Sequence, residues 1–192
     1  LPYDPDNDLL EMWEFAVDFD NGIAALNELP PIPVAEFDSN LCDFQRSCLP
    51  QPLRPDGSLP PGLDPIPHII MHRLQYRSFG TYETLVGNFT VDSYSQDLAA
   101  IRWFVLRREP GDDWELYQEG IVNPQDDVHR FMGSIAMDGE GNIALGYTAT
   151  GRQLHPSLRY TGRLSTDPLG TMPQGEYEIA RGSGSQLGFD RW

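Results

Sequence analysis

The chain has 192 residues, 40% of them hydrophobic, which is enough for one ordinary domain with a core of its own. It contains no lysine, and 13 arginines against 29 acidic residues give a formal net charge of −16. Such a charge repels phosphate backbones and anionic headgroups, so nucleic acids and anionic membrane surfaces are excluded as expected partners. No apolar run approaches the roughly 20 residues that a membrane-spanning helix needs.

Residues 1–28 are interpreted as the end of a preceding sheet unit. Met12–Phe19 is predicted as the third strand of that incomplete unit, because Trp13 takes the place that Trp103 and Tyr160 take later in the chain. The first residues have no basic start and no apolar stretch, so they do not form a signal peptide.

Residues 29–67 are predicted to be a long irregular insertion. They hold 10 of the 17 prolines, and proline lacks the N–H that a strand ladder needs. Both cysteines, Cys42 and Cys48, lie in this segment with five residues between them. We expect a local disulfide between them, which would indicate an oxidising compartment. Two free thiols in a reducing cell are the alternative.

The rest of the chain shows short β segments separated by turns, in two successive sets of four. Residues 68–125 form the first set and residues 126–186 the second, while residues 187–192 begin a further unit. In the first set the expected strands are 69–78, 82–92, 100–108 and 114–121. In the second set they are 131–137, 143–150, 156–164 and 176–181.

The two sets echo each other in sequence. His72-Arg73-Leu74 returns as His129-Arg130-Phe131 after 57 residues and as Asp190-Arg191-Trp192 after a further 61. Arg102-Trp103 likewise returns as Arg159-Tyr160. Four antiparallel strands in each repeat of this length are typical of a β-propeller blade. The expected fold is therefore all-β: a partial β-propeller with a long proline-rich insertion. Since propellers have roughly 4 to 8 blades, the chain is expected to be part of a larger protein. A self-contained β-sandwich is the structural alternative.

Several stretches carry a resemblance to a known group of proteins. Met132–Asp138, Gly141–Tyr147 and Pro156–Arg163 resemble uncharacterised secreted bacterial proteins with sialidase-like, BNR-type β-propeller repeats. The resemblance implies a propeller fold and export, but no established reaction. The Asp-box of true sialidases is not reproduced, since Asp138–Asn142 has similar turn chemistry without the serine spacing and the aromatic residue.

Arg73, Arg130 and Arg191 are the candidate site residues, because they recur at the head of successive inner strands. In a propeller they would line one mouth of the central channel, where guanidinium groups can hold a carboxylate or a sulfate. The alternative is a structural role for these arginines. Asp126, Asp127 and Asp190 are the first candidates for a catalytic carboxylate pair, but ion pairs with the arginines are the favoured interpretation of these acids. No catalytic residue is assigned.

No cofactor and no metal site are predicted. His72 and His129 could bind a metal only with a third ligand, which the spacing does not supply. Calcium at the acidic turns Asp4–Asp8 and Asp138–Asn142 is the alternative.

The sequence thus predicts an exported binding or assembly module of an extracellular, periplasmic or cell-surface complex. The partners expected are other protein chains, the rest of its own propeller, or a glycan, with no membrane span. The alternative is a sialidase-like glycoside hydrolase that uses an arginine-lined channel mouth.

Overall fold

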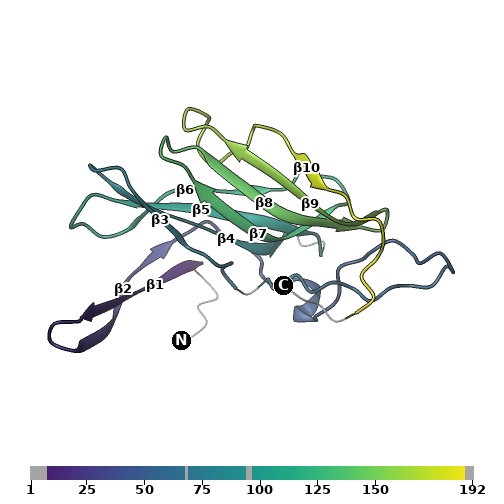
Figure 1. The fold of residues 1–192 in the computed structure, drawn as a ribbon, viewed down its shortest axis with the longest axis horizontal. Helices are drawn as coiled ribbons and strands as arrows, with labels where there is room; N and C mark the ends of the chain where they lie inside the picture. The colour runs from purple at the N-terminus through teal and green to yellow at the C-terminus, as the bar shows by residue number, and fades with distance from the viewer. Residues whose placement is uncertain (1–7, 68, 94–96, 189–192) are drawn as a thin grey trace.

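The computed structural model describes residues 8–67, 69–93 and 97–188, which form ten strands and one turn of 3-10 helix (Figure 1). The strands are β1 (Leu9–Asp18), β2 (Ile23–Pro33), β3 (Gln75–Ser78), β4 (Glu83–Asp92), β5 (Ala99–Arg108), β6 (Glu115–Val122), β7 (His129–Met137), β8 (Ile143–Gly151), β9 (Leu154–Arg163) and β10 (Tyr177–Ala180). The helical turn η1 spans Cys42–Phe44. Across the described ranges we find no helix of the length and apolarity that a bilayer crossing requires. Because the described elements are strands apart from one helical turn, the expected all-β class is confirmed.

Eight of the strands form two antiparallel sheets of four. The first sheet has the order β3-β4-β5-β6, and the second has the order β7-β8-β9-β10. Both orders follow the chain, because each strand turns back beside the previous one through a short connection. The prediction of four-stranded antiparallel sheets is confirmed. These two sheets form a stack, and the described residues do not close a ring of sheets.

The two sheets pack face to face over a shared core. The first sheet contributes Val86, Ile101, Trp103, Val105 and Val122, and the second contributes Ile135, Met137, Ile143, Leu145 and Tyr147. Strand β7 lies directly against β4 and β5. Gly133 permits this close approach, because a Cβ atom added there would stand 2.1 Å from Asn88 Oδ1.

A second core lies on the other face of the first sheet. There Phe89, Phe104 and Leu106 pack against Leu10 and Ile32, which belong to β1 and β2. As a result β5 is buried over eight successive residues. In β8, by contrast, the first seven residues alternate between buried and more exposed positions. This period of two is the pattern of a strand with only one covered face.

Strands β1 and β2 pair with each other as a two-stranded hairpin, which we call the hairpin arm. The strand predicted at Met12–Phe19 is thus present, but its partner β2 was not foreseen. Strand β2 ends at Pro33, so the irregular segment begins five residues later than expected. Pro30 and Pro31 fit because they lie in a bulge, between residues that pair with β1, where no ladder N–H is required.

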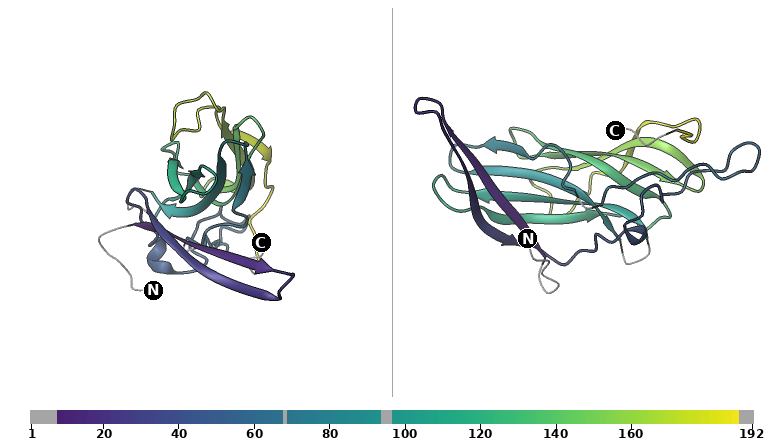
Figure 2. Two further views of the ribbon diagram at one scale, coloured as in Figure 1. Left: turned by 90° about the vertical axis from the view of Figure 1, so that its left-hand side faces the viewer. Right: turned by 90° about the horizontal axis from the view of Figure 1, so that it is seen from below.

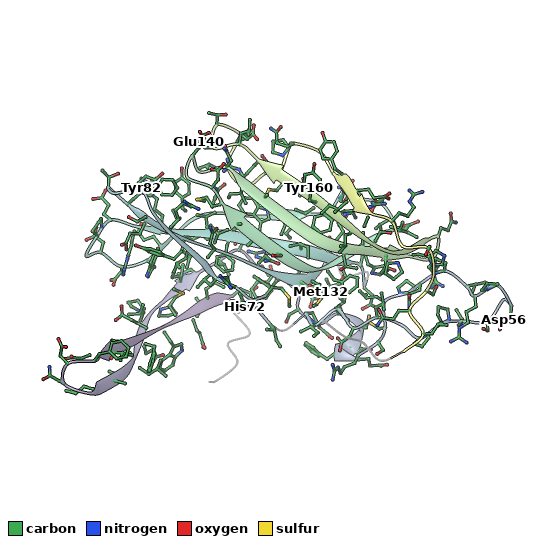
Figure 3. The ribbon with its side chains drawn as sticks, in the orientation of Figure 1. Asp56, His72, Tyr82, Met132, Glu140 and Tyr160 are labelled. Atoms are coloured by element: carbon green, nitrogen blue, oxygen red, sulfur yellow. A yellow bond between two sulfur atoms is a disulfide. The ribbon has the colours of Figure 1, made fainter. Side chains whose placement is uncertain are left out.

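In its described residues, the segment between β2 and β3 holds no further strand, apart from two isolated bridges. It is anchored by Leu41, Leu49 and Leu63, which are buried against Ala99 of β5 and Phe131 of β7. The predicted Cys42–Cys48 disulfide is formed and closes the short loop between Leu41 and Leu49. The tip of the segment, near Asp56, and the turn of the hairpin arm lie at opposite ends of the molecule (Figures 2 and 3).

The expected strand of residues 69–78 is shorter in the structure, where β3 covers Gln75–Ser78 alone. Before it the chain still lies beside β4, since the Met71 N–H donates to the Asn88 carbonyl at 2.8 Å. The exposed side chains of Ile69 and Ile70 do not reach a core. The other seven strands of the two sheets lie where the residue pattern places them, within two residues at each end.

Candidate functional site

Two of the three arginines predicted to line a channel mouth, Arg73 and Arg130, have different environments. Arg130, the second residue of β7, is 1% exposed. Arg73 is exposed in the segment before β3. Arg191 lies outside the described residues. The proposed anion site at these positions therefore stays a prediction, and of the two described arginines only Arg130 is held in a defined polar network.

All five N–H groups of Arg130 are engaged. Its Nη1 donates to Asp126 Oδ1 at 2.8 Å and to the Val128 carbonyl at 2.9 Å, and its Nη2 donates to Asp126 Oδ2 at 3.0 Å. Its Nε and Nη2 donate to the two carboxylate oxygens of Glu176, at 2.6 and 3.2 Å. The expected ion pair with Asp126 is confirmed. An incoming anion would have to displace one of these carboxylates, because a guanidinium has five donors only.

Glu176, just before β10, is the centre of this network. It accepts hydrogen bonds from Arg130, from Arg159 of β9 and from the Tyr147 hydroxyl, the last at 2.7 Å. Burial alone would raise the pKa of Glu176, but the hydrogen bonds from Arg130 and Tyr147 lower it below its usual value. Burial and the Glu176 carboxylate raise the pKa of Tyr147, so Tyr147 remains a neutral donor. The charges of the network are already paired with one another.

A related ion pair lies in the first sheet. Arg102 of β5 is 4% exposed and forms a salt bridge with Glu119 of β6. Its Nη2 also donates to the Ala35 carbonyl at 2.7 Å, and Glu119 accepts from the Ala35 N–H at 2.8 Å. This pair fastens the chain after the hairpin arm onto the first sheet. Glu119 is the partner of Arg102 that the sequence pattern did not lead us to expect. The signal was available, because Glu119 and Glu176 are separated by the same 57 residues as Arg102 and Arg159.

His129, at the start of β7, borders a cavity of about 730 Å³ beside the disulfide. The lining includes Asp97, Asp127, Arg152 and Arg159. The His129 Nδ1 accepts a hydrogen bond from the Ala99 N–H at 3.3 Å, which links the two sheets. Burial, together with the nearby Arg152 charge, lowers the pKa of His129 to about 4. The imidazole is therefore neutral at pH 7.

The candidate metal ligands do not gather into a site. Within the ranges that the structure describes, no group of three or more His, Cys, Asp or Glu side chains is placed to hold an ion. His72, labelled in Figure 3, is exposed. At Asp138–Asn142 the Asp138 carboxylate accepts hydrogen bonds from the Glu140 and Asn142 backbones, so it closes its own turn. The acidic turn at Asp4–Asp8 falls almost wholly outside the described residues.

A different kind of surface lies on the outer face of the second sheet, which we call the open face. Strand registers place the following side chains on it: Ser134, Ala136, Ala144, Gly146, Thr148, Leu158, Tyr160, Gly162 and Tyr177. None of them is charged. Leu158, Tyr160 and Tyr177 are 49%, 42% and 54% exposed, and the two tyrosine rings stack at 5.4 Å. A sheet face that meets water commonly carries polar and charged side chains, so the uncharged composition of this face sets it apart.

Comparisons of this chain with protein-family models, with curated proteins and with solved structures find no match. Function must therefore be inferred from the molecule itself.

Proposed function

We propose that this chain forms consecutive blades of an exported β-propeller, and that it acts as a binding or assembly module of an extracellular or cell-surface complex. The observation that carries the proposal is the pair Trp103 and Tyr160. They hold matching positions on the third strands of the two sheets, β5 and β9. Trp103 is fully buried beneath the second sheet. Tyr160, labelled in Figure 3, is exposed on the open face.

Matching residues of the two sheets point in the same direction along the stack. Trp103 points toward the second sheet, and Tyr160 points onward from the second sheet. Arg102 points back toward the chain after the hairpin arm, and Arg159 points back into the network beneath the second sheet. In a sandwich of two facing, equivalent sheets, matching residues would face each other. Units that repeat in one direction leave one face uncovered at the end of the row, as the blades of an incomplete propeller do.

The strand registers support two units of one design. Phe89 of β4 pairs with Arg102 of β5, and Tyr147 of β8 pairs with Arg159 of β9. The two Arg–Glu ion pairs also join matching strands, with Glu119 and Glu176 on the side of the fourth strand. A third sheet with the inner-face chemistry of the second would cover the open face as the second sheet covers Trp103.

The disulfide supports the exported location, because disulfides persist in oxidising compartments and are rare in the cytosol of mesophiles. The glycoside hydrolase considered above would need free guanidinium groups and a carboxylate pair at the channel mouth. The donors of Arg130 are already used by Asp126 and Glu176. We therefore favour binding or assembly over catalysis.

Thiol labelling tests whether the open face is covered in the natural protein. With Cys42 and Cys48 bonded to each other, the variant Tyr160→Cys carries a single free thiol. In the isolated 192-residue chain this thiol should react with a maleimide at the rate of an exposed side chain. In the full natural gene product, or in its native assembly, it should be protected by at least about tenfold, because the next sheet would bury it.

Asp112→Cys is the matched control, since Asp112 lies in the exposed turn between β5 and β6. Its thiol should react equally fast in both preparations. If the thiol of Tyr160→Cys reacted equally fast in the isolated chain and in the natural product, the face would be uncovered in both and the proposal would end.

A further inference from the structure

The hairpin arm has one mainly apolar face and one face of mixed polarity, which we call its apolar face and its polar face. In an antiparallel pair, residues directly opposite each other share a face. Phe15 pairs with Leu26 and Val17 with Ala24. Trp13 lies on the same face two residues before Phe15, together with its partner Glu28 at the base of the arm. The other face carries Glu14, Ala16 and Asp18 with their partners Asn27, Ala25 and Ile23.

The apolar face is uncovered along most of its length. Trp13, Phe15, Val17 and Leu26 are 47%, 68%, 41% and 62% exposed. Only the base of the arm is fixed, where Leu10 and Ile32 are buried on the first sheet. Figure 2 shows the remainder extending away from the two sheets. A two-stranded hairpin is at best marginally stable in water by itself, so a partner that covers this face would gain much apolar burial.

The arm also has unpaired edges. Strands β1 and β2 form a sheet of two, so in the described part of the chain the outer edge of each bears main-chain N–H and C=O groups that no further strand engages. Such edges pair readily with an added strand. An extended segment of another protein could therefore combine ladder hydrogen bonds with contacts to Phe15 and Leu26.

The charge of this region selects the partner. The first 45 residues contain 11 acidic residues and no basic one, since Arg46 is the first arginine of the chain. Five of these acids, Glu11, Glu14, Asp18, Asp20 and Glu28, lie in the arm itself. At the turn, hydrogen bonds from Asn21 lower the pKa of Asp18, so its carboxylate stays ionised. The arm is thus an apolar surface with a uniformly negative border.

We propose that the hairpin arm is a docking element for a protein segment in which apolar and basic residues alternate. The apolar side chains of that segment cover Phe15 and Leu26, and its Arg or Lys side chains meet the acidic border. A second copy of this chain does not fit, because two arms would bring ten carboxylates together with no counter-charge. An anionic membrane is repelled for the same reason. The inference names one surface by which the proposed binding module contacts a partner. It rests on the proposed function only in that the chain is taken to be a binding module.

Fluorescence anisotropy with labelled peptides tests the inference on the 192-residue chain. The probe is a 12-residue peptide of alternating valine and arginine, and the control peptide has glutamate in place of arginine. The arginine peptide should bind, and raising the salt from about 0.05 to about 0.5 M should weaken it, because salt screens the charge pairs. The glutamate peptide should not bind.

The double variant Phe15→Ser/Leu26→Ser should weaken binding of the arginine peptide by about tenfold or more, because it removes two apolar contacts. Ile23→Ser is the matched control. Ile23 is 61% exposed on the same strand as Leu26, but on the polar face. This variant should bind like the parent chain. Circular dichroism of each variant should show unchanged strand content, since none of these residues is buried.

Four outcomes would overturn the inference. Equal binding of both peptides removes the role of charge. Binding of neither peptide removes the docking site itself. An equal loss in Ile23→Ser removes the role of the apolar face. Self-association of the chain, or its binding to zwitterionic vesicles, that Phe15→Ser/Leu26→Ser abolishes would identify a second copy or a membrane as the occupant. The labelling result for Tyr160→Cys is independent of all four, so this inference and the propeller proposal can fail separately.

Discussion

The first sheet is covered on both faces, whereas the second sheet is covered on one. This difference explains why strands in the two sheets have unlike patterns. Strand β5 is almost continuously apolar, because the hairpin base lies on one side of it and the second sheet on the other. On the open face, β8 and β9 carry small residues and a few large apolar ones without charge. In the described structure Leu158, Tyr160 and Tyr177 on this face remain exposed.

The Arg–Glu ion pairs of the two sheets differ as well. Arg102 also donates to the Ala35 and Glu36 carbonyls, so it fixes a covering segment to the first sheet. In the second sheet, Glu176 serves both Arg159 and Arg130 and lies beneath the sheet, toward the first. The Arg102 pair thus joins a covering segment to the first sheet, whereas the Glu176 network joins residues of the second sheet with the loop before it.

The largest expected difference in stability is that between variants at the matching aromatic positions, Trp103 and Tyr160. Trp103→Ala should lower the free energy of unfolding by about 3–5 kcal/mol, because it empties a fully buried site between the two sheets. Tyr160→Ala should change the stability of the isolated chain by no more than about 1 kcal/mol, because Tyr160 is exposed. Urea denaturation measures both values. Similar losses in the two variants would mean that the open face is not open in solution.

The loss in the free energy of unfolding on removing each acid should follow the burial of its arginine and the number of partners that the arginine keeps. Glu176→Ala should cost about 3 kcal/mol, because it leaves the buried Arg130 with Asp126 as its single carboxylate partner. Glu119→Ala should cost less, about 1–2 kcal/mol, because Arg102 keeps two main-chain acceptors. Urea denaturation again supplies the values, and Glu178→Ala, at an exposed ion pair, serves as the control. A larger loss for Glu119→Ala would contradict the view of Glu176 as the centre of the network.

The link between the sheets at His129 should depend on pH. Its pKa is about 4 in the folded chain, below the ordinary value of 6.5, so the unfolded chain binds a proton more readily between these values. Stability should therefore fall as the pH is lowered from 6.5 to 4.5, by about 2 kcal/mol from this group. His129→Asn keeps an acceptor for the Ala99 N–H and cannot titrate, so its stability should decline less over this window. His72→Asn, at an exposed position, should decline like the parent chain; a parent-like decline in His129→Asn would exclude this source of the pH dependence.

Much of the fold was predictable because the signals for strands and turns are local. The turns Glu109–Asp113 and Asp138–Asn142 separate runs of β-branched and aromatic residues, and the strands begin and end close to them. Strand β2 was not predictable in the same way. Its prolines argue against a strand, and they are tolerated only because β2 pairs on one side and bulges at Pro30-Pro31.

The candidate site was predicted less well than the fold. The sequence echo singled out Arg130, but nothing local shows that Glu176, 46 residues later, uses up its donors. The matching separation of Glu119 and Glu176 is visible in the sequence, yet it gains meaning only once each acid is seen beside its arginine. Long-range pairing of this kind depends on how sheets stack.

By itself, the sequence determined the all-β class, the two successive sets of four strands, the cysteine bond and the acidic character of the chain. These follow from turn chemistry, residue period, short loop closure and charge, all of which act over a few residues or over the whole composition. Only the tertiary structure decided which face of each sheet is covered, that Arg130 is saturated and that the hairpin arm stands apart. Those outcomes depend on contacts between residues far apart in the chain, and such contacts exist only after the sheets have packed.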